Sequence, residues 1–152
     1  MEKRVILKLE QNGKDFGYVQ LKNDIFYSNG TKEQAVVFEL ENYHDLPDTH
    51  YYRVADTKKG YMDVKYTSSR VQVVEPWISV DLSSICAWKY INNSLRMVVN
   101  QTETGKMLSS SQDLESKALY ANFYEGKPFK VTQVEVKNAN NKSNPELAHA
   151  II

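Results

Sequence analysis

The sequence predicts a nearly all-β fold, and three observations carry that prediction. No segment repeats apolar residues at the 3.6-residue period of an amphipathic helix over a dozen positions. Short runs rich in β-branched and aromatic residues alternate with turns that contain Asn, Gly and Asp. A glycine followed by an alternating strand pattern occurs three times, at Gly17, Gly60 and Gly105, with spacings of 43 and 45 residues. The chain therefore divides into three units of similar length.

The first unit contains four predicted strands. Alternation and β-branched residues mark 5–9, and Asn12-Gly13 after it is a strong hairpin signal. The other predicted strands are 17–21, 25–27 and 35–40. A polar loop at 42–50, which contains Pro47, ends the unit.

The second and third units follow the same plan. The predicted strands of the second unit are 51–54, 60–66, 70–74 and 85–91. An insertion at 75–84 contains Pro76, which argues against a central strand there. The predicted strands of the third unit are 95–99, 105–108, a weakly marked strand near Leu114, and 118–124 as the closing strand. A loop at 109–113, a turn at 125–128 and a further strand at 129–136 complete the prediction.

Length and charge bound the domain organisation and the partners. The 152 residues suit one domain, so we expect a single domain over 1–137 and a flexible Asn-, Lys- and Ser-rich tail over 138–152. Lys and Arg total 19, and Asp and Glu total 19. Nucleic-acid binders normally carry a basic excess, so a nucleic-acid partner is not expected.

Cysteine count and hydropathy bound the compartment. Cys86 is the single cysteine, so no internal disulfide can form. Lys8 and Glu10 interrupt the apolar run near the N-terminus, which argues against a signal peptide. No stretch reaches the roughly 20 apolar residues of a membrane span. A cytoplasmic protein is the expectation, with non-classical release left open.

The three units resemble the lobes of a β-trefoil, in which a hydrophobic-x-Gly-Tyr-hydrophobic pattern recurs once per lobe. Gly17-Tyr18 and Gly60-Tyr61 keep the pattern, and Lys106 replaces the tyrosine in the third copy. The resemblance covers about 5–136 and implies three four-stranded lobes around one shared core. Another antiparallel barrel or a β-sandwich is the alternative.

The resemblance does not extend to particular trefoil families. The Gln-x-Trp motif of ricin-type sugar-binding trefoils is missing from the sequence. The neutral charge differs from the basic growth factors, and one cysteine cannot supply the disulfides usual in Kunitz-type inhibitors. Fascin-like trefoils are also intracellular and disulfide-free, but they usually occur as tandem copies.

The insertion at 75–84 supplies the first candidate site. Trp77 lies between Glu75 and Asp81, and an aromatic ring beside carboxylates is a common arrangement in sugar sites. The ring stacks on the apolar face of a pyranose while the acids accept hydroxyl hydrogen bonds. The structural alternative is that Trp77 caps the open end of a barrel.

The loop at 44–50 supplies the second candidate. His44, Asp45, Asp48 and His50 place two imidazoles and two carboxylates within seven residues. We assign Asp45 and Asp48 to the candidate ligand-binding set and regard His44 and His50 as weak metal-ligand candidates. A solvated loop without metal is the simpler interpretation, and no cofactor is expected.

Cys86 and Trp88 belong to the predicted strand 85–91 and are interpreted as core residues. A catalytic thiol needs a neighbouring base that lowers its pKa, and no histidine is near Cys86 in sequence.

We therefore expect a non-catalytic, lectin-like recognition module rather than an enzyme. Carbohydrate or a glycoprotein is the expected partner, on the basis of abundant Tyr, Asn- and Asp-rich loops and the trefoil resemblance. A protein-interaction role through the loops at 42–50 and 75–84, as in a cytosolic trefoil inhibitor or scaffold, is the alternative. The oligomeric state is left open.

Overall fold

The computed structural model describes residues 3–55, 60–64, 70–74, 85–110, 117–122 and 127–137. Within these ranges thirteen strands form one antiparallel sheet, and no helix is present. None of the described residues form a helix capable of crossing a membrane. The strands are β1 (Arg4–Gln11), β2 (Lys14–Lys22), β3 (Ile25–Gly30), β4 (Phe38–Asn42), β5 (Thr49–Val54), β6 (Tyr61–Val64), β7 (Val71–Val74), β8 (Ala87–Ile91), β9 (Ser94–Val99), β10 (Thr102–Ser110), β11 (Leu119–Asn122), β12 (Lys127–Pro128) and β13 (Lys130–Glu135).

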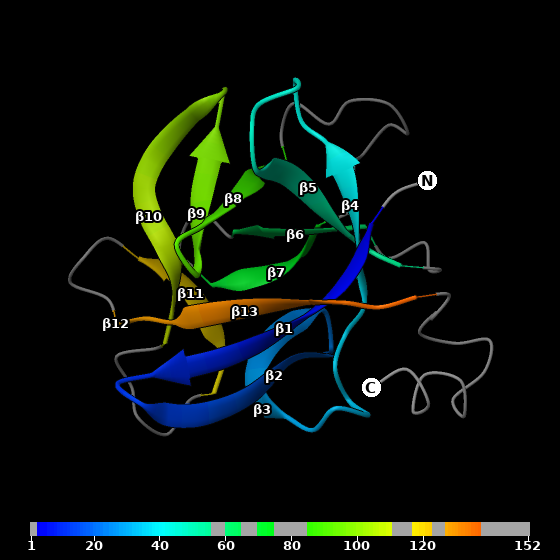
Figure 1. Ribbon diagram of the computed structural model, residues 1–152, viewed down its shortest axis with the longest axis vertical. Helices are drawn as coiled ribbons and strands as arrows, with labels where there is room; N and C mark the ends of the chain where they lie inside the picture. The colour runs from blue at the N-terminus through cyan, green and yellow to red at the C-terminus, as the bar shows by residue number, and fades with distance from the viewer. Residues whose placement is uncertain are drawn as a thin grey trace.

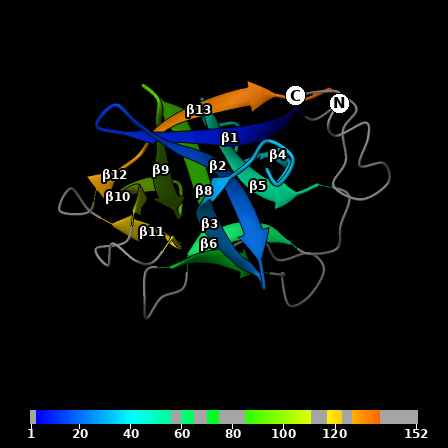
Figure 2. The same ribbon diagram turned by 90° about the horizontal axis from the view of Figure 1, so that it is seen from below.

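The sheet closes on itself as a barrel (Figure 1). The path β5-β4-β1-β2-β3-β7-β6 is closed by the pairing of β6 with β5, at Arg53 and Tyr61. β8, β9, β10 and β11 continue the sheet from β5, and β12 pairs with β10. β13 lies along β1 in both ribbon views (Figure 2), so the last described strand pairs with the first. The predicted antiparallel all-β class is confirmed.

One hydrogen bond recurs at three places in the barrel. In each case a backbone amide donates to the carbonyl of the residue directly before a neighbouring strand, at a distance of 2.7 to 2.9 Å. The donor and acceptor pairs are Leu40 to Lys3, Tyr90 to Asp48, and Val131 to Asn93. The acceptors are spaced 45 residues apart, so the barrel repeats the same connection once per unit.

Three hairpins meet on one side of the barrel. The hairpins β2–β3, β6–β7 and β10–β11 contact one another at three residue pairs. These pairs are Ile25 with Gln72, Tyr27 with Ala118, and Arg70 with Tyr120. Each hairpin thus contacts both of the others, and the contacts form a triangle.

The core lies inside the barrel and is built from all three units. Its largest fully buried side chains include Trp88, Tyr52, Phe26 and Phe38. Trp88 donates its indole N–H to the carbonyl of Met62 at 3.0 Å, which satisfies the polar atom of the buried ring. The predictions that Trp88 and Cys86 are core residues are confirmed, because both side chains are buried.

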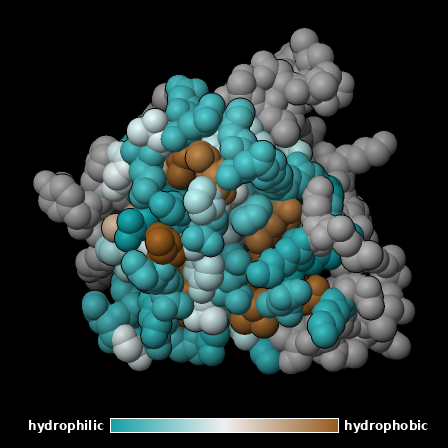
Figure 3. Space-filling view, turned by 45° about the horizontal axis from the view of Figure 1, so that its top comes forward, coloured by the Kyte–Doolittle hydropathy of each residue, from teal (hydrophilic) through white to brown (hydrophobic). Residues whose placement is uncertain are grey.

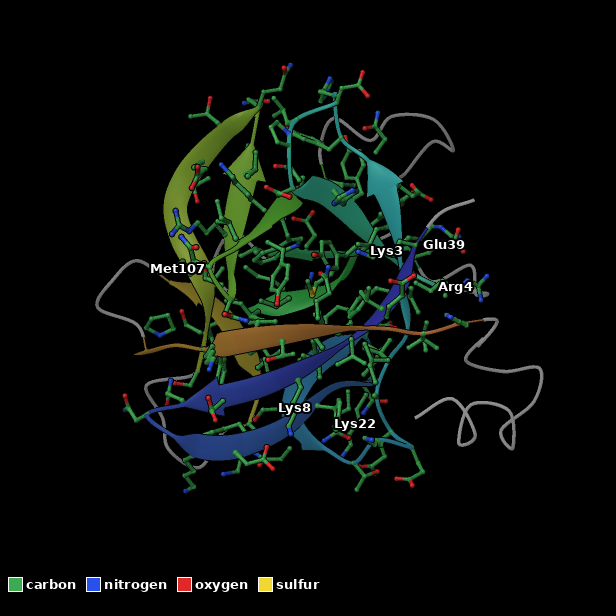
Figure 4. All side chains as sticks on the ribbon, in the orientation of Figure 1. Lys3, Arg4, Lys8, Lys22, Glu39 and Met107 are labelled. Atoms are coloured by element: carbon green, nitrogen blue, oxygen red, sulfur yellow. The ribbon has the colours of Figure 1, made fainter. Side chains whose placement is uncertain are left out.

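A ladder of charges stabilises the outer face of β1, β4 and β5. Arg4 contacts Glu39 at 3.1 Å, close to the N-terminal end of β1 (Figure 4). Arg53 pairs with Glu39 and with Glu41, the latter at 2.7 Å, and Glu41 also accepts the Tyr61 hydroxyl. Each carboxylate has a partner, so we assign this cluster a structural role.

Several sequence predictions are corrected by the structure. Ser109 and Ser110 were expected in a loop, but both belong to β10. Ser109 is tolerated in a buried strand because its hydroxyl donates to the Met107 carbonyl at 2.7 Å. Lys127–Pro128 forms the short strand β12 rather than a turn. β4 begins at Phe38 instead of residue 35.

The closing strand of the third unit was also misplaced. The segment 118–124 was predicted to close the unit, but β11 pairs with β10 and belongs to the hairpin triangle. β13 takes the closing position, since it pairs with β1 and carries the Val131 amide of the recurring hydrogen bond. The tail 138–152, predicted to be flexible, lies outside the described residues.

The recurring glycines have positive φ values. φ is 64° at Gly17, 102° at Gly60 and 88° at Gly105, a region that L side chains rarely adopt. A Cβ atom at Gly17 would lie 2.7 Å from the carbonyl oxygen of Gly30. Gly13 also has positive φ, at 77°, but a Cβ there would meet nothing within 4 Å.

This contrast predicts different costs for two alanine substitutions. Gly13→Ala should lower the free energy of unfolding by about 1 kcal/mol, the strain of positive φ. Gly17→Ala should cost about 1–3 kcal/mol more, because the added methyl group overlaps backbone of β3. Chemical denaturation of the two variants measures both values. Equal costs would show that the close approach at Gly30 does not constrain the barrel.

Candidate functional site

The loop between β4 and β5, residues 43–48, is held in a compact conformation. His44, Asp45 and Asp48 have φ values of 51°, 55° and 58°, a conformation that Asn, Asp and His adopt more readily than most residues. The Leu46 amide donates to the Tyr43 carbonyl at 3.0 Å, which closes a turn inside the loop.

Tyr43 joins this loop to the turn between β9 and β10. Its hydroxyl oxygen accepts the Gln101 amide at 2.9 Å, across 58 residues of sequence. The Tyr43 ring is buried and meets the Tyr51 ring edge-on at 5.0 Å, and Tyr51 meets Tyr61 in the same way at 5.8 Å. The loop and the turn stand side by side at the top of the barrel (Figure 1).

A groove of about 360 Å³ lies between the loop, the turn and β8. Its lining combines apolar and polar side chains from two different units of the chain. The lining residues are Leu46, Pro47, Thr49, Lys89, Val98, Gln101, Thr102 and Glu103. We refer to it as the β4–β5 groove.

The polar groups of the β4–β5 groove include one cation and one carboxylate. Lys89 lies 3.4 Å from Glu103, and Arg96 beside the groove lies 3.6 Å from the other oxygen of Glu103. Gln101 adds an amide, and Thr49 and Thr102 add hydroxyls. These groups can donate and accept hydrogen bonds, and Leu46 and Pro47 supply an apolar surface.

The site residues predicted in this loop, His44, Asp45, Asp48 and His50, do not line the groove. Asp45 and Asp48 are exposed, and the Asp48 carbonyl accepts the Tyr90 amide. The ring of His44 packs edge-on against Tyr43 at 4.7 Å. Burial is the main cause that lowers the pKa of His50, with the charge of Lys3 adding to it and Asp48 opposing it.

The prediction that His44 and His50 are metal ligands would need further ligands close to them. Among the described residues, no group of three or more His, Cys, Asp or Glu side chains is placed to hold an ion. Trp77, Glu75 and Asp81, the candidate sugar residues of the insertion, lie outside the described residues.

Sequence inspection did not identify the far wall of the groove. Lys89, Gln101, Thr102 and Glu103 come from the second and third units and carry no shared motif. Barrel closure and the Tyr43–Gln101 hydrogen bond bring them to the loop. The predicted polar loop at 42–50 was the one sequence feature that pointed toward this part of the barrel.

Asp63 on β6 and Cys86 just before β8 form a buried polar pair. The Asp63 carboxylate accepts the backbone amides of Val64 at 2.7 Å and Cys86 at 3.3 Å. Burial raises the pKa of Asp63, and these hydrogen bonds oppose the increase. In the other two units a backbone carbonyl accepts the corresponding bond, from Val36 to Val19 and from Phe129 to Leu108. Asp63 is therefore a structural substitute for a main-chain acceptor.

The raised pKa of Asp63 predicts a pH dependence of stability. A carboxyl group whose pKa is higher in the folded state favours folding while protonated, so its contribution is lost as pH rises above its ordinary value of 3.8 and through the raised value. Asp63→Asn should remove this loss and flatten unfolding free energy against pH over that range. Asp45→Asn, on the exposed loop, is the control. An Asp63→Asn curve that parallels the wild type would contradict the assignment.

Tyr43→Phe tests how the groove is held together. Removal of the hydroxyl deletes the acceptor of the Gln101 amide, so hydrogen exchange at that amide should become faster. The free energy of unfolding should fall by about 1 kcal/mol or less, because the amide can bind water at the exposed turn. Exchange measured by NMR reports both effects. Unchanged protection of Gln101 would show that the bond does not hold the turn.

Comparisons with known proteins identified a similar structure but did not assign the chain to a family. Neither the family models nor the curated protein sequences gave a match. The structure is similar to that of a GH43 β-1,3-galactosidase, with a TM-score of 0.57 and 11% sequence identity. The likeness covers 96% of this chain and 31% of the galactosidase chain. At this identity the likeness shows a shared fold alone, and the chain spans about a third of the length of that protein.

Proposed function

We propose that the barrel is a β-trefoil. The recurring amide–carbonyl bond, with acceptors 45 residues apart, supports this assignment. The triangle of hairpins also supports it, and so does the positive-φ glycine that recurs once per unit, at Gly17, Gly60 and Gly105. Each unit then consists of four strands, ending with β4, β8 and β13, and the short strand β12 is an addition to the third.

We further propose that the protein is a non-catalytic carbohydrate-binding module, and the β4–β5 groove carries this proposal. Sugar sites combine an apolar surface for the C–H face of a pyranose with fixed donors and acceptors for its hydroxyls. Leu46 and Pro47 offer the surface, and Gln101, Glu103 and Lys89 offer the polar groups. The volume of about 360 Å³ suits one or two sugar rings.

Two further observations support a sugar over a large apolar partner. The fold is similar to part of a protein whose name, β-1,3-galactosidase, gives it an activity on a galactoside. On the face shown in Figure 3, hydrophobic residues form small patches separated by hydrophilic ones. A surface of this type favours polar ligands, because it offers no broad apolar area to bury.

The proposed role is binding rather than hydrolysis. Most glycoside hydrolases place two carboxyl groups on either side of the scissile bond. Glu103 is the single carboxylate among the described residues that line the groove, and two cations adjoin it. A carboxylate held this way is suited to accept hydroxyl hydrogen bonds.

Glu103→Gln tests the proposed function. Loss of the charged acceptor should weaken galactose or galactoside binding about tenfold, the value of one charge-assisted hydrogen bond. Saturation-transfer NMR and a glycan array measure the affinity. Glu10→Gln is the matched control, because Glu10 is about as exposed as Glu103 and pairs with Lys130 at 3.5 Å. Neither Glu10 nor Lys130 lines the groove. An array without any bound glycan, or equal effects of both variants, would refute carbohydrate binding at this site.

A protein partner is the second candidate, favoured by the shape of the loop. His44, Pro47 and Asp48 are exposed on a loop whose base is fixed by Tyr43. A fixed, projecting loop loses little conformational entropy when it enters a partner's cleft. Replacement of residues 44–48 by a short turn should abolish capture of such a partner, and capture that survives the replacement would refute this candidate.

A further inference from the structure

We propose that the β4–β5 groove selects acidic saccharides, with Lys89 and Arg96 binding the carboxylate of a hexuronate. This inference rests on the proposed function, since it names the class of sugar that the same groove takes. Its basis is the charge and the donor capacity of three side chains on β8, β9 and β10.

The three side chains carry a net positive charge. Lys89 and Arg96 are directly opposite each other in the register of β8 and β9, and Glu103 lies on the neighbouring strand β10. Two cations therefore share one carboxylate. The contacts of 3.4 and 3.6 Å are long for charge-assisted hydrogen bonds, which are usually about 2.7–2.9 Å. An anion bound closer to Lys89 and Arg96 would form shorter and stronger hydrogen bonds with both cations than Glu103 does.

Among the described residues, the contacts of the two cations leave some of their N–H donors unused. A lysine ammonium has three N–H donors and an arginine guanidinium has five. Arg96 uses its Nε–H on the Ser94 hydroxyl at 3.2 Å, which fixes the direction of the guanidinium. Glu103 is the other acceptor that both cations contact. A ligand carboxylate would fill the remaining donors with planar, bidentate geometry at Arg96.

The other lining residues of the groove would bind the sugar ring. Gln101 and Thr102 lie beside Glu103 and can bind the ring hydroxyls, opposite the apolar surface of Leu46 and Pro47. The loop carboxylates of Asp45 and Asp48 do not line the groove. An acidic ligand therefore meets Glu103 as the single carboxylate of the described lining.

Galactose and galacturonic acid provide a matched pair of ligands, because they differ only in the group at C6. We expect galacturonic acid to bind about tenfold tighter than galactose, the value of a charge-assisted contact. The preference should decrease with added salt, since the groove is open to solvent. Titration by NMR at low and at high salt measures the affinity and its salt dependence.

Variants separate the cations from the groove itself. Lys89→Met keeps the aliphatic stem and should weaken the binding of galacturonic acid more than that of galactose, so that most of the preference is lost. Arg96→Gln gives a second, independent test of the same loss. Lys130→Met is the matched control, since Lys130 also pairs with a glutamate, Glu10, and neither residue lines the groove. Glu103→Gln should weaken galactose binding and yet increase the ratio of galacturonic acid to galactose affinity.

The outcomes distinguish this inference from the proposed function. Equal affinity for the two sugars would overturn the acidic preference and leave carbohydrate binding intact. Binding of neither sugar would overturn both. Competition by sodium acetate at the same concentration as galacturonic acid would show a simple anion site, and would also overturn the inference.

Discussion

Pairing of the first described strand with the last is the constraint on which the rest of the structure depends. β1 exchanges backbone hydrogen bonds with β13 along Val5–Glu10 and with β4 at its start. These pairings leave β1 without an open edge and bring three units of the chain around one core. No single unit could bury Trp88, Tyr52 and Phe38 by itself, because these side chains pack with residues from the other units. Closure also fixes which loops become neighbours at the rim, and so where a site can form.

The groove arises from a departure from the threefold repeat. The recurring hydrogen bond has equivalent acceptors at Asp48 and Asn93, but the connections around them differ. β8 and β9 are joined by the two-residue turn Asn92-Asn93, whereas β4 and β5 are joined by the longer loop 43–48. The longer loop lies beside the β9–β10 turn, and the hydrogen bond between Tyr43 and Gln101 joins the two. The repeated barrel therefore supports the groove, and an unrepeated loop supplies one of its walls.

How much could be predicted from the sequence varies with the type of interaction. Strands marked by apolar and β-branched runs, such as β1 and β9, were placed to within one or two residues, since local composition defines them. Ser109 and Ser110 were misassigned because serine favours loops, and only a partner strand and a main-chain acceptor make it suitable for a buried strand. The closing strand of the third unit was misassigned because the places of β11 and β13 in the barrel depend on their pairing partners, which no local pattern shows.

The sequence by itself determined the all-β class, the three glycine-marked units, the buried positions of Trp88 and Cys86, and the presence of a long loop between two strands in the range 42–50. These features depend on local periodicity and on backbone conformations that only certain residues adopt. Tertiary structure alone decided that Lys89 and Glu103 face Leu46 and Pro47, and that Asp63 replaces a main-chain acceptor. The physical reason is that such contacts join residues 20 or more positions apart, and barrel closure, which no local pattern records, sets their distances.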